Sequence, residues 1–159
     1  MRYPLHILLL IACITSTAAL GQTKPPPRVD PTKYAIIGYN KAIGLTIFDK
    51  SDNPRTATLS RAEVDNMEIL VDSAYRRFCN YSLAGNRSSP KPLSVYKRQY
   101  IAIVNGRGQK EVQINFFCDP PNDWRKNVSI VFDGGVCVLK LRINLTLRKA
   151  YDLIPNGVA

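Results

Sequence analysis

"SRAEVDNMEILVDSAYRRFCN", residues 60–80, is the stretch that decides the fold, because it contains a complete helix signal. Ser60 and Glu63 have the spacing of a capping box, and Leu59 and Val64 have the spacing of a hydrophobic staple. The apolar residues that follow recur every three or four positions and form one face: Val64, Met67, Val71, Ala74, Tyr75 and Phe78. The pattern predicts one amphipathic helix that begins at Ser60 and ends near Asn80.

Beyond the helix, the sequence has the alternating pattern of β-strands. "RQYIAIV" (98–104) and "KEVQINFFC" (110–118) flank the pair Asn105-Gly106. Because Asn-Gly supplies the positive φ angles of a tight turn, we expect a hairpin here. In its second strand, Glu111, Gln113 and Asn115 alternate with the apolar residues and therefore share one face.

More strands are predicted on either side of this hairpin. Residues 128–132 ("VSIVF") and 136–145 ("VCVLKLRINL") are two of them, with Asp133-Gly134-Gly135 as the turn between them. A last strand is expected at 150–154, and one or two within 34–49, folded at Asn40-Lys41.

These elements indicate an α+β domain. Each strand has one apolar face to cover and the helix has one apolar face to offer, so the two bury each other. We expect one long helix packed across a curved antiparallel sheet of four to six strands. The order of one helix followed by a meander is a cystatin-like arrangement, which is an analogy of fold only.

The first 21 residues have the layout of a secretory signal peptide: a basic start, an apolar run and small residues before the cleavage point. The alternative is a bacterial lipoprotein signal, with Cys13 as the lipid-anchored first residue. Residues 22–33 ("QTKPPPRVDPTK") form a Pro-rich linker, and residues 34–159 form a single domain. We therefore expect an exported protein, periplasmic or secreted.

Composition excludes several classes of enzyme. The only histidine, His6, lies in the signal peptide, so the mature chain has none. Ser-His-Asp and Cys-His catalysis, and most catalytic zinc sites, need an imidazole. With 22 Lys and Arg against 12 Asp and Glu, the chain carries a net charge of +10, and no cofactor or metal is expected.

Three cysteines remain after cleavage: Cys79, Cys118 and Cys137. An oxidising compartment favours one disulfide and one odd thiol, whereas the alternative is three buried thiols. Spacing alone does not assign the connectivity. Cys118 and Cys137 both fall on the apolar side of their predicted strands.

The basic residues of the strand at 136–145 form the main candidate site. Lys140 and Arg142 share a strand face, and Gln113 and Asn115 are expected on the same side of the sheet. Such a surface suits an anionic glycan, a lipid head group or an envelope protein. The alternative is a solvated face whose charges prevent aggregation. Nucleic acid is not expected, because only Phe117 is available for stacking.

Two other groups of residues deserve comparison with this face. Glu111, Asp119, Asp123 and Asp133 are the carboxylates that a hydrolase without histidine would need, but nothing in their spacing pairs them. Trp124 follows "DPPND" in a loop, where it is either a ligand-binding anchor or a cover for the sheet.

The succession "YKRQYIAIVNGRGQKEVQINFFC" (96–118), "DWRK" (123–126) and "VFDGGVCVLKLRINLTLRKAYDLIPNGVA" (131–159) resembles small uncharacterised exported proteins of Bacteroidetes-type bacteria. The resemblance covers most of residues 59–159. It implies export and a bacterial source, and it assigns no chemistry.

The sequence thus predicts an exported, non-enzymatic binding or interaction domain whose ligand is unknown and is anionic if the basic face binds it. A small hydrolase that uses only carboxylates and a structural partner of an envelope complex are the alternatives. Protease inhibition does not rank above binding, because "QYIAIVNG" departs from the Gln-x-Val-x-Gly hairpin of cystatins.

Overall fold

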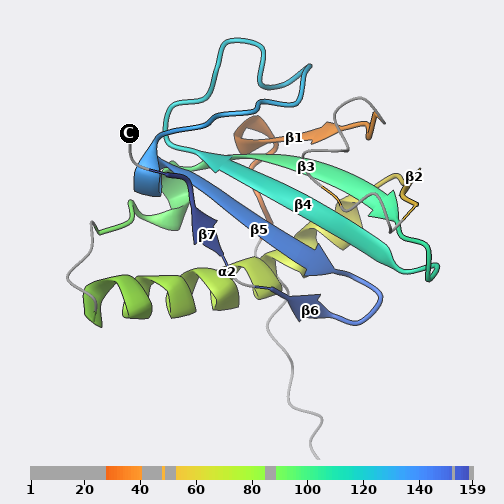
Figure 1. The fold of residues 1–159 in the computed structure, drawn as a ribbon, viewed down its shortest axis with the longest axis horizontal. Coiled ribbons are helices and arrows are strands. Elements are labelled where there is room, and N and C mark those ends of the chain that lie inside the picture. Colours follow the sequence, from red (N-terminus) through yellow and green to blue (C-terminus); the bar gives the residue numbers. More distant parts are fainter. Residues whose placement is uncertain (1–27, 41–47, 49–52, 85–88, 152, 158–159) are drawn as a thin grey trace, which may run out of the picture.

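The computed structural model describes residues 28–40, 48, 53–84, 89–151 and 153–157. Within them the chain forms one long helix and a mixed, open sheet of seven strands (Figure 1). The α+β class is therefore confirmed. The predicted signal peptide, the first half of the Pro-rich linker (22–27) and Lys41 of the predicted fold at Asn40-Lys41 lie outside the described residues.

Three long antiparallel strands form the centre of the sheet: β3 (Lys97–Val104), β4 (Lys110–Phe117) and β5 (Val138–Asn144). Their register places Tyr100 opposite Ile114, and Ile114 opposite Leu141. These three side chains point to the same face and are fully buried there.

Short strands cover both edges of this centre. β1 (Tyr34–Ile37) and β2 (Arg55–Thr56) pair with the two ends of β3, while β6 (Lys149–Ala150) and β7 (Ile154–Pro155) pair with the two ends of β5. The β1–β3 pair is parallel, so the expectation of a purely antiparallel sheet is wrong. The number of strands also exceeds the predicted four to six, because each edge carries two short strands in place of one long one.

The helix α2 (Arg61–Ala84) runs across one face of the sheet (Figure 1). The capping box is present: the Ser60 hydroxyl accepts from the Glu63 amide at 3.2 Å, and the Glu63 carboxylate accepts from the Ser60 amide at 2.8 Å. All six predicted core-face residues of the helix are buried. They pack on the apolar face of β3, β4 and β5.

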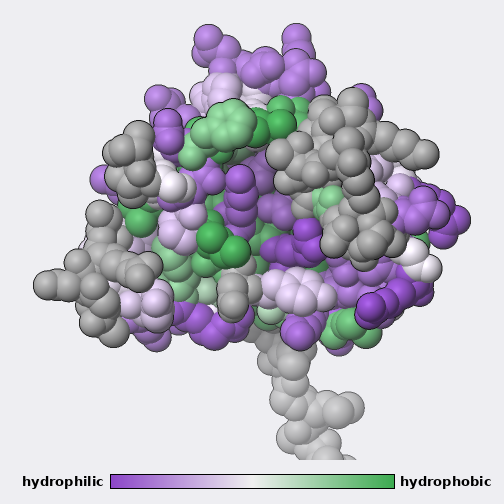
Figure 2. All heavy atoms as spheres, viewed as in Figure 1, coloured by the Kyte–Doolittle hydropathy of each residue, from purple (hydrophilic) through white to green (hydrophobic). Residues whose placement is uncertain are grey.

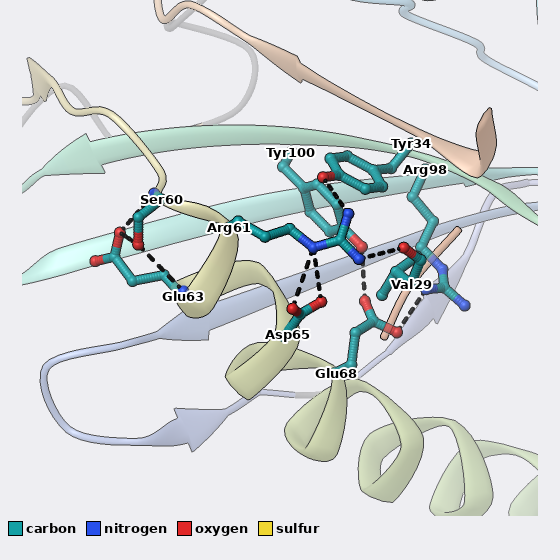
Figure 3. A network of polar contacts seen from close by, with 9 residues as sticks. All are labelled: Val29, Tyr34, Ser60, Arg61, Glu63, Asp65, Glu68, Arg98 and Tyr100. Carbon is teal, nitrogen blue, oxygen red and sulfur yellow. Dashed lines mark hydrogen bonds and ion pairs between the residues drawn. The ribbon is translucent and has the colours of Figure 1, made fainter. Parts of the chain in front are cut away.

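A polar network fixes the first half of the helix (Figure 3). Arg61 pairs with Asp65 and also donates to the Tyr34 hydroxyl at 3.1 Å and to the Val29 carbonyl at 2.6 Å. Two segments far apart in the sequence, 29–34 and the start of α2, are thereby held side by side.

One helix turn further on, Glu68 is buried and forms an ion pair with Arg98 of β3. The Tyr100 hydroxyl donates to the same carboxylate at 2.6 Å (Figure 3). Burial raises the pKa of the Glu68 carboxyl, although Arg98 and Tyr100 act in the opposite direction. Burial, and then the nearby carboxylate, raise the pKa of Tyr100 well above its ordinary value.

The two predicted glycine turns differ from the expectation. In the β3–β4 loop it is Gly108, not Gly106, that has a positive φ (+75°). The side chain of Asn105 accepts from the amides of Arg107 and Gln109, both at 3.0 Å, and so closes a five-residue loop in place of a two-residue turn.

Gly134 and Gly135 do have positive φ, at +111° and +50°, but they do not connect two strands. Residues 128–132 are not a strand, so this prediction is wrong. The segment is held instead by the end of the chain: Asn156 donates to the Asp133 carbonyl at 3.0 Å, and Gly135 donates to the Gly157 carbonyl at 3.1 Å. A 3-10 turn, Gly135–Cys137, then leads into β5.

Cys118 and Cys137 form a disulfide, with Cα atoms 5.0 Å apart. The pairing follows from the register, because Phe117 and Val138 are the last partners of β4 and β5 and the two cysteines come next on each strand. Cys79 is a free, half-buried thiol on the helix. Of the two alternatives from sequence, the structure supports one disulfide and one thiol.

Candidate functional site

The face of the sheet that points away from the helix is divided into two halves. Over β1 and β3 it is apolar, and it carries a second small core of Ala35, Ile37, Phe48, Ile101, Ile103 and Trp124. Over β4 and β5 it is polar, because Glu111, Gln113 and Asn115 alternate out of the main core there. Among the described residues, packed side chains close the apolar half, whereas the polar half lines a cavity.

The polar half forms the floor of a cavity of about 640 Å³. Two cross-strand pairs lie at its centre: Gln113 opposite Arg142, and Asn115 opposite Lys140. Figure 2 shows hydrophilic side chains recessed at the centre of this face, with hydrophobic ones beside them. The structure thus brings together the four polar residues that the sequence placed on one sheet face.

One end of the cavity is a closed hydrogen-bond network. The Glu111 carboxylate accepts from the side-chain amides of Asn105, at 3.0 Å, and Asn144, at 3.2 Å. The Gln109 carbonyl oxygen accepts from the same two amides, at 3.3 and 2.9 Å. Asn144 also accepts from the Leu147 amide at 2.9 Å. The hydrogen-bonding groups of this network therefore pair with one another, and they fix the β3–β4 loop against the end of β5.

The centre of the floor is different, because its amides are buried but weakly bonded. Gln113 is 7% exposed and Asn115 is 4% exposed. The Gln113 amide nitrogen lies 3.3 Å from the Ile114 carbonyl oxygen and 3.4 Å from the Asn115 side-chain oxygen, which are long hydrogen bonds. Among the described residues, no hydrogen bond reaches the Asn115 amide nitrogen or the Gln113 carbonyl oxygen, and neither is a fully buried atom, so both are open to the cavity.

The cations of the floor, Lys140 and Arg142, differ in their surroundings. Lys140 is exposed and makes no ion pair with the described residues. The guanidinium of Arg142 lies over the ring of Phe48, 5.2 Å from its centroid. Arg142 therefore contacts the apolar half of the sheet face through Phe48 and also lines the cavity of the polar half.

Apolar side chains line the rim of the same cavity. Ile130, Leu147 and Ile154 are 44%, 55% and 60% exposed, and Tyr151 is 37% exposed. A polar floor with a few charged groups and an apolar rim is the usual composition of a small-molecule site.

Trp124 does not line this cavity. It is 6% exposed and packs on Ile101 and Ile103 in the second core, where Arg125 lies over its ring at 4.6 Å. Gln99, which is fully buried, holds its loop by donating to the Trp124 and Asn127 carbonyls and accepting from the Ser129 amide at 3.0 Å. The tryptophan thus covers the sheet, one of the two roles that the sequence left open.

The candidate carboxylates do not come together. Glu111 is in the closed network, whereas Asp119, Asp123 and Asp133 are exposed and do not line the cavity. Among the described residues, no group of three or more His, Cys, Asp or Glu side chains could hold a metal ion.

Sequence reasoning missed Asn105, Arg107 and Gln109, which come from the β3–β4 loop, and Tyr151, which comes from beyond β6. The sequence could have indicated the loop residues, because an Asx turn at Asn105 orients Arg107 and Gln109 toward the end of the sheet. Tyr151 carries none, because its place depends on a bond from its amide to the Arg142 carbonyl at 2.9 Å.

None of the helices among the described residues has the length and apolar character needed to span a membrane. No protein-family model matches this chain, and neither curated proteins nor solved structures show a match to it.

Proposed function

We propose that this chain is an exported, non-enzymatic binding domain that takes an anionic ligand in the polar cavity of its sheet face. One observation carries the proposal: Lys140 lies beside the buried Asn115, and Arg142 beside the buried Gln113, at the floor of one cavity. A solvated protective face would present its charges on a convex or flat surface, whereas these charges flank buried amides in a hollow.

The charge of the lining favours an anion. Arg107, Lys140 and Arg142 are cationic, and among the described lining residues Glu111 is the only carboxylate. Glu111 already accepts two amide hydrogen bonds, so it offers little to a cation. Walls of low dielectric strengthen the attraction of such a cavity for negative charge.

The Cys118–Cys137 disulfide supports the proposal of export, because disulfides persist in oxidising compartments. The signal-peptide pattern of residues 1–21 points the same way. The bacterial source implied by the resemblance, and the cystatin-like arrangement, stay proposals about origin and fold, and neither names a ligand.

A hydrolase is not favoured by the same geometry. Catalysis by carboxylates needs two of them facing one substrate, and Glu111 is the only one of the four candidates at the cavity. The remaining alternative is a role as a structural partner of an envelope complex, and the binding experiment distinguishes it from ligand binding.

The test is binding of three anionic probes to the mature protein, measured by isothermal titration calorimetry: inorganic phosphate, trigalacturonate and phosphatidylglycerol vesicles. We expect at least one to bind, and Lys140→Gln to weaken that binding by about tenfold, the value of a charged hydrogen bond. Lys91→Gln is the matched control, because Lys91 is exposed and does not line the cavity. Equal binding by the two variants, or no binding of any probe, contradicts the proposal. Capture of an envelope protein that resists Lys140→Gln supports the structural alternative.

A further inference from the structure

We propose that the ligand of this cavity is a saccharide that carries a carboxylate. The inference rests on the proposed function and narrows the class of ligand from any anion to an acidic sugar. It is argued from the buried amides, from the position of the cation and from the apolar rim.

The buried amides require a partner that both donates and accepts. The free amide nitrogen of Asn115 needs an acceptor, and the free carbonyl oxygen of Gln113 needs a donor. A ligand that displaces solvent from these atoms must replace the hydrogen bonds that the solvent makes there. A hydroxyl group meets both needs, whereas phosphate and sulfate at neutral pH offer almost only acceptors. The floor therefore favours a ligand that is rich in hydroxyl groups.

The ammonium group of Lys140 favours a ligand that also carries a negative group. It lies directly across from Asn115, so one ligand group can receive the amide of Asn115 and the ammonium of Lys140 together. The cation beside Asn115 is a lysine, which is a point charge and carries no fork for bidentate binding of phosphate, whereas the guanidinium of Arg142 lies against the ring of Phe48. A single carboxylate next to a hydroxyl matches this pair.

The rim offers surface for the apolar faces of sugar rings. Tyr151, Ile130 and Ile154 are exposed above the polar floor. A membrane surface fits less well, because the amides that a head group would have to reach are more than nine-tenths buried at the floor of the hollow.

The experiment compares trigalacturonate with galactotriose, its neutral counterpart, on the mature protein by calorimetry. We expect trigalacturonate to bind at least about tenfold more tightly, since a charge-assisted hydrogen bond is lost with the carboxylate. Lys140→Gln should remove most of this difference. Asn115→Leu, which keeps the approximate size of the side chain, should weaken trigalacturonate binding about tenfold relative to the control variant Lys91→Gln.

The outcomes separate the two proposals. If phosphate or vesicles bind in a Lys140-dependent manner and trigalacturonate does not, the proposed function stands and the saccharide inference is overturned. If no anionic probe distinguishes Lys140→Gln from Lys91→Gln, both are overturned. If Asn115→Leu fails to fold by circular dichroism, Gln113→Met provides the same measurement. A folded amide variant with undiminished trigalacturonate binding overturns the inference.

Discussion

The guanidinium of Arg98, on β3, and the carboxylate of Glu68, on α2, form a buried ion pair that joins the sheet to the helix. Both side chains are at most 7% exposed, and the Nε of Arg98 has no partner among the described residues. Burial of two charges carries a desolvation cost, so we expect the pair to specify how the helix packs on the sheet more than it stabilises the fold.

Breaking the pair on one side should be strongly destabilising. We expect Arg98→Met to lower the free energy of unfolding by about 3–5 kcal/mol, because it leaves the Glu68 carboxylate buried and unpaired. Urea denaturation measures the change. The double variant Arg98→Met/Glu68→Leu should recover much of the loss, and additive losses in the double variant would refute the coupling.

The pH dependence of stability should distinguish Glu68 from Glu63. Because burial raises the pKa of Glu68 above its ordinary 4.5, its contribution is fully present below pH 4.5 and is lost as pH rises through the folded-state pKa. We therefore expect the wild type to lose stability relative to Glu68→Gln as pH rises above 4.5, measured by urea denaturation at each pH.

Glu63 serves as the control with the opposite sign. Burial alone would raise the pKa of Glu63, but hydrogen bonds from Lys110 and Ser60 outweigh it and lower the pKa. Its contribution is present above its unfolded pKa and lost as pH falls. The wild type should therefore gain stability relative to Glu63→Gln as pH rises from acid. The same slope for both variants would contradict the assignment.

The disulfide should contribute measurably to stability. Reduction, or Cys118→Ala/Cys137→Ala, opens a loop with a sequence separation of 19 and should cost about 2–4 kcal/mol. Thiol labelling of the mature protein, unfolded without reductant, should then find a single reactive group at Cys79. Three labelled thiols would show that the bond is absent.

Gly134 should be intolerant of substitution. Its φ is +111°, and a Cβ there would lie 2.5 Å from a methyl carbon of Val138. We expect Gly134→Ala to cost about 1–3 kcal/mol, the usual penalty for a strained backbone position. Gly38→Ala is the matched control, because among the described residues no atom beyond its chain neighbours lies within 4 Å of the added Cβ. Thermal unfolding compares the two, and an equal effect would exclude a special role for Gly134.

Trp124 should be a packing residue and not a ligand anchor. We expect Trp124→Ala to lower the free energy of unfolding by about 3–5 kcal/mol, since it empties the second core under the 119–128 loop. Trp124→Phe should cost less and should leave trigalacturonate binding unchanged, because the ring does not line the cavity. Loss of binding in a fully folded Trp124→Phe would reverse this conclusion.

The sequence by itself determined the features that depend on neighbours along the chain. The helix and its buried face follow from the 3.6-residue period, and the capping box follows from the spacing of Ser60 and Glu63. The alternation of strands placed Gln113 and Asn115 out of the main core. The single histidine, His6, lies in the predicted signal peptide, so the sequence alone predicts no imidazole chemistry in the mature chain.

Only the tertiary structure decided what depends on the pairing of distant segments. The register of β4 and β5 selects Cys137 as the partner of Cys118 and sets Lys140 beside Asn115. The parallel pairing of β1 and the approach of Glu68 to Arg98 have no local signal either. The physical reason is that strand register and helix placement are fixed by burial across the whole core, whereas a periodic pattern records only which side of one element is buried.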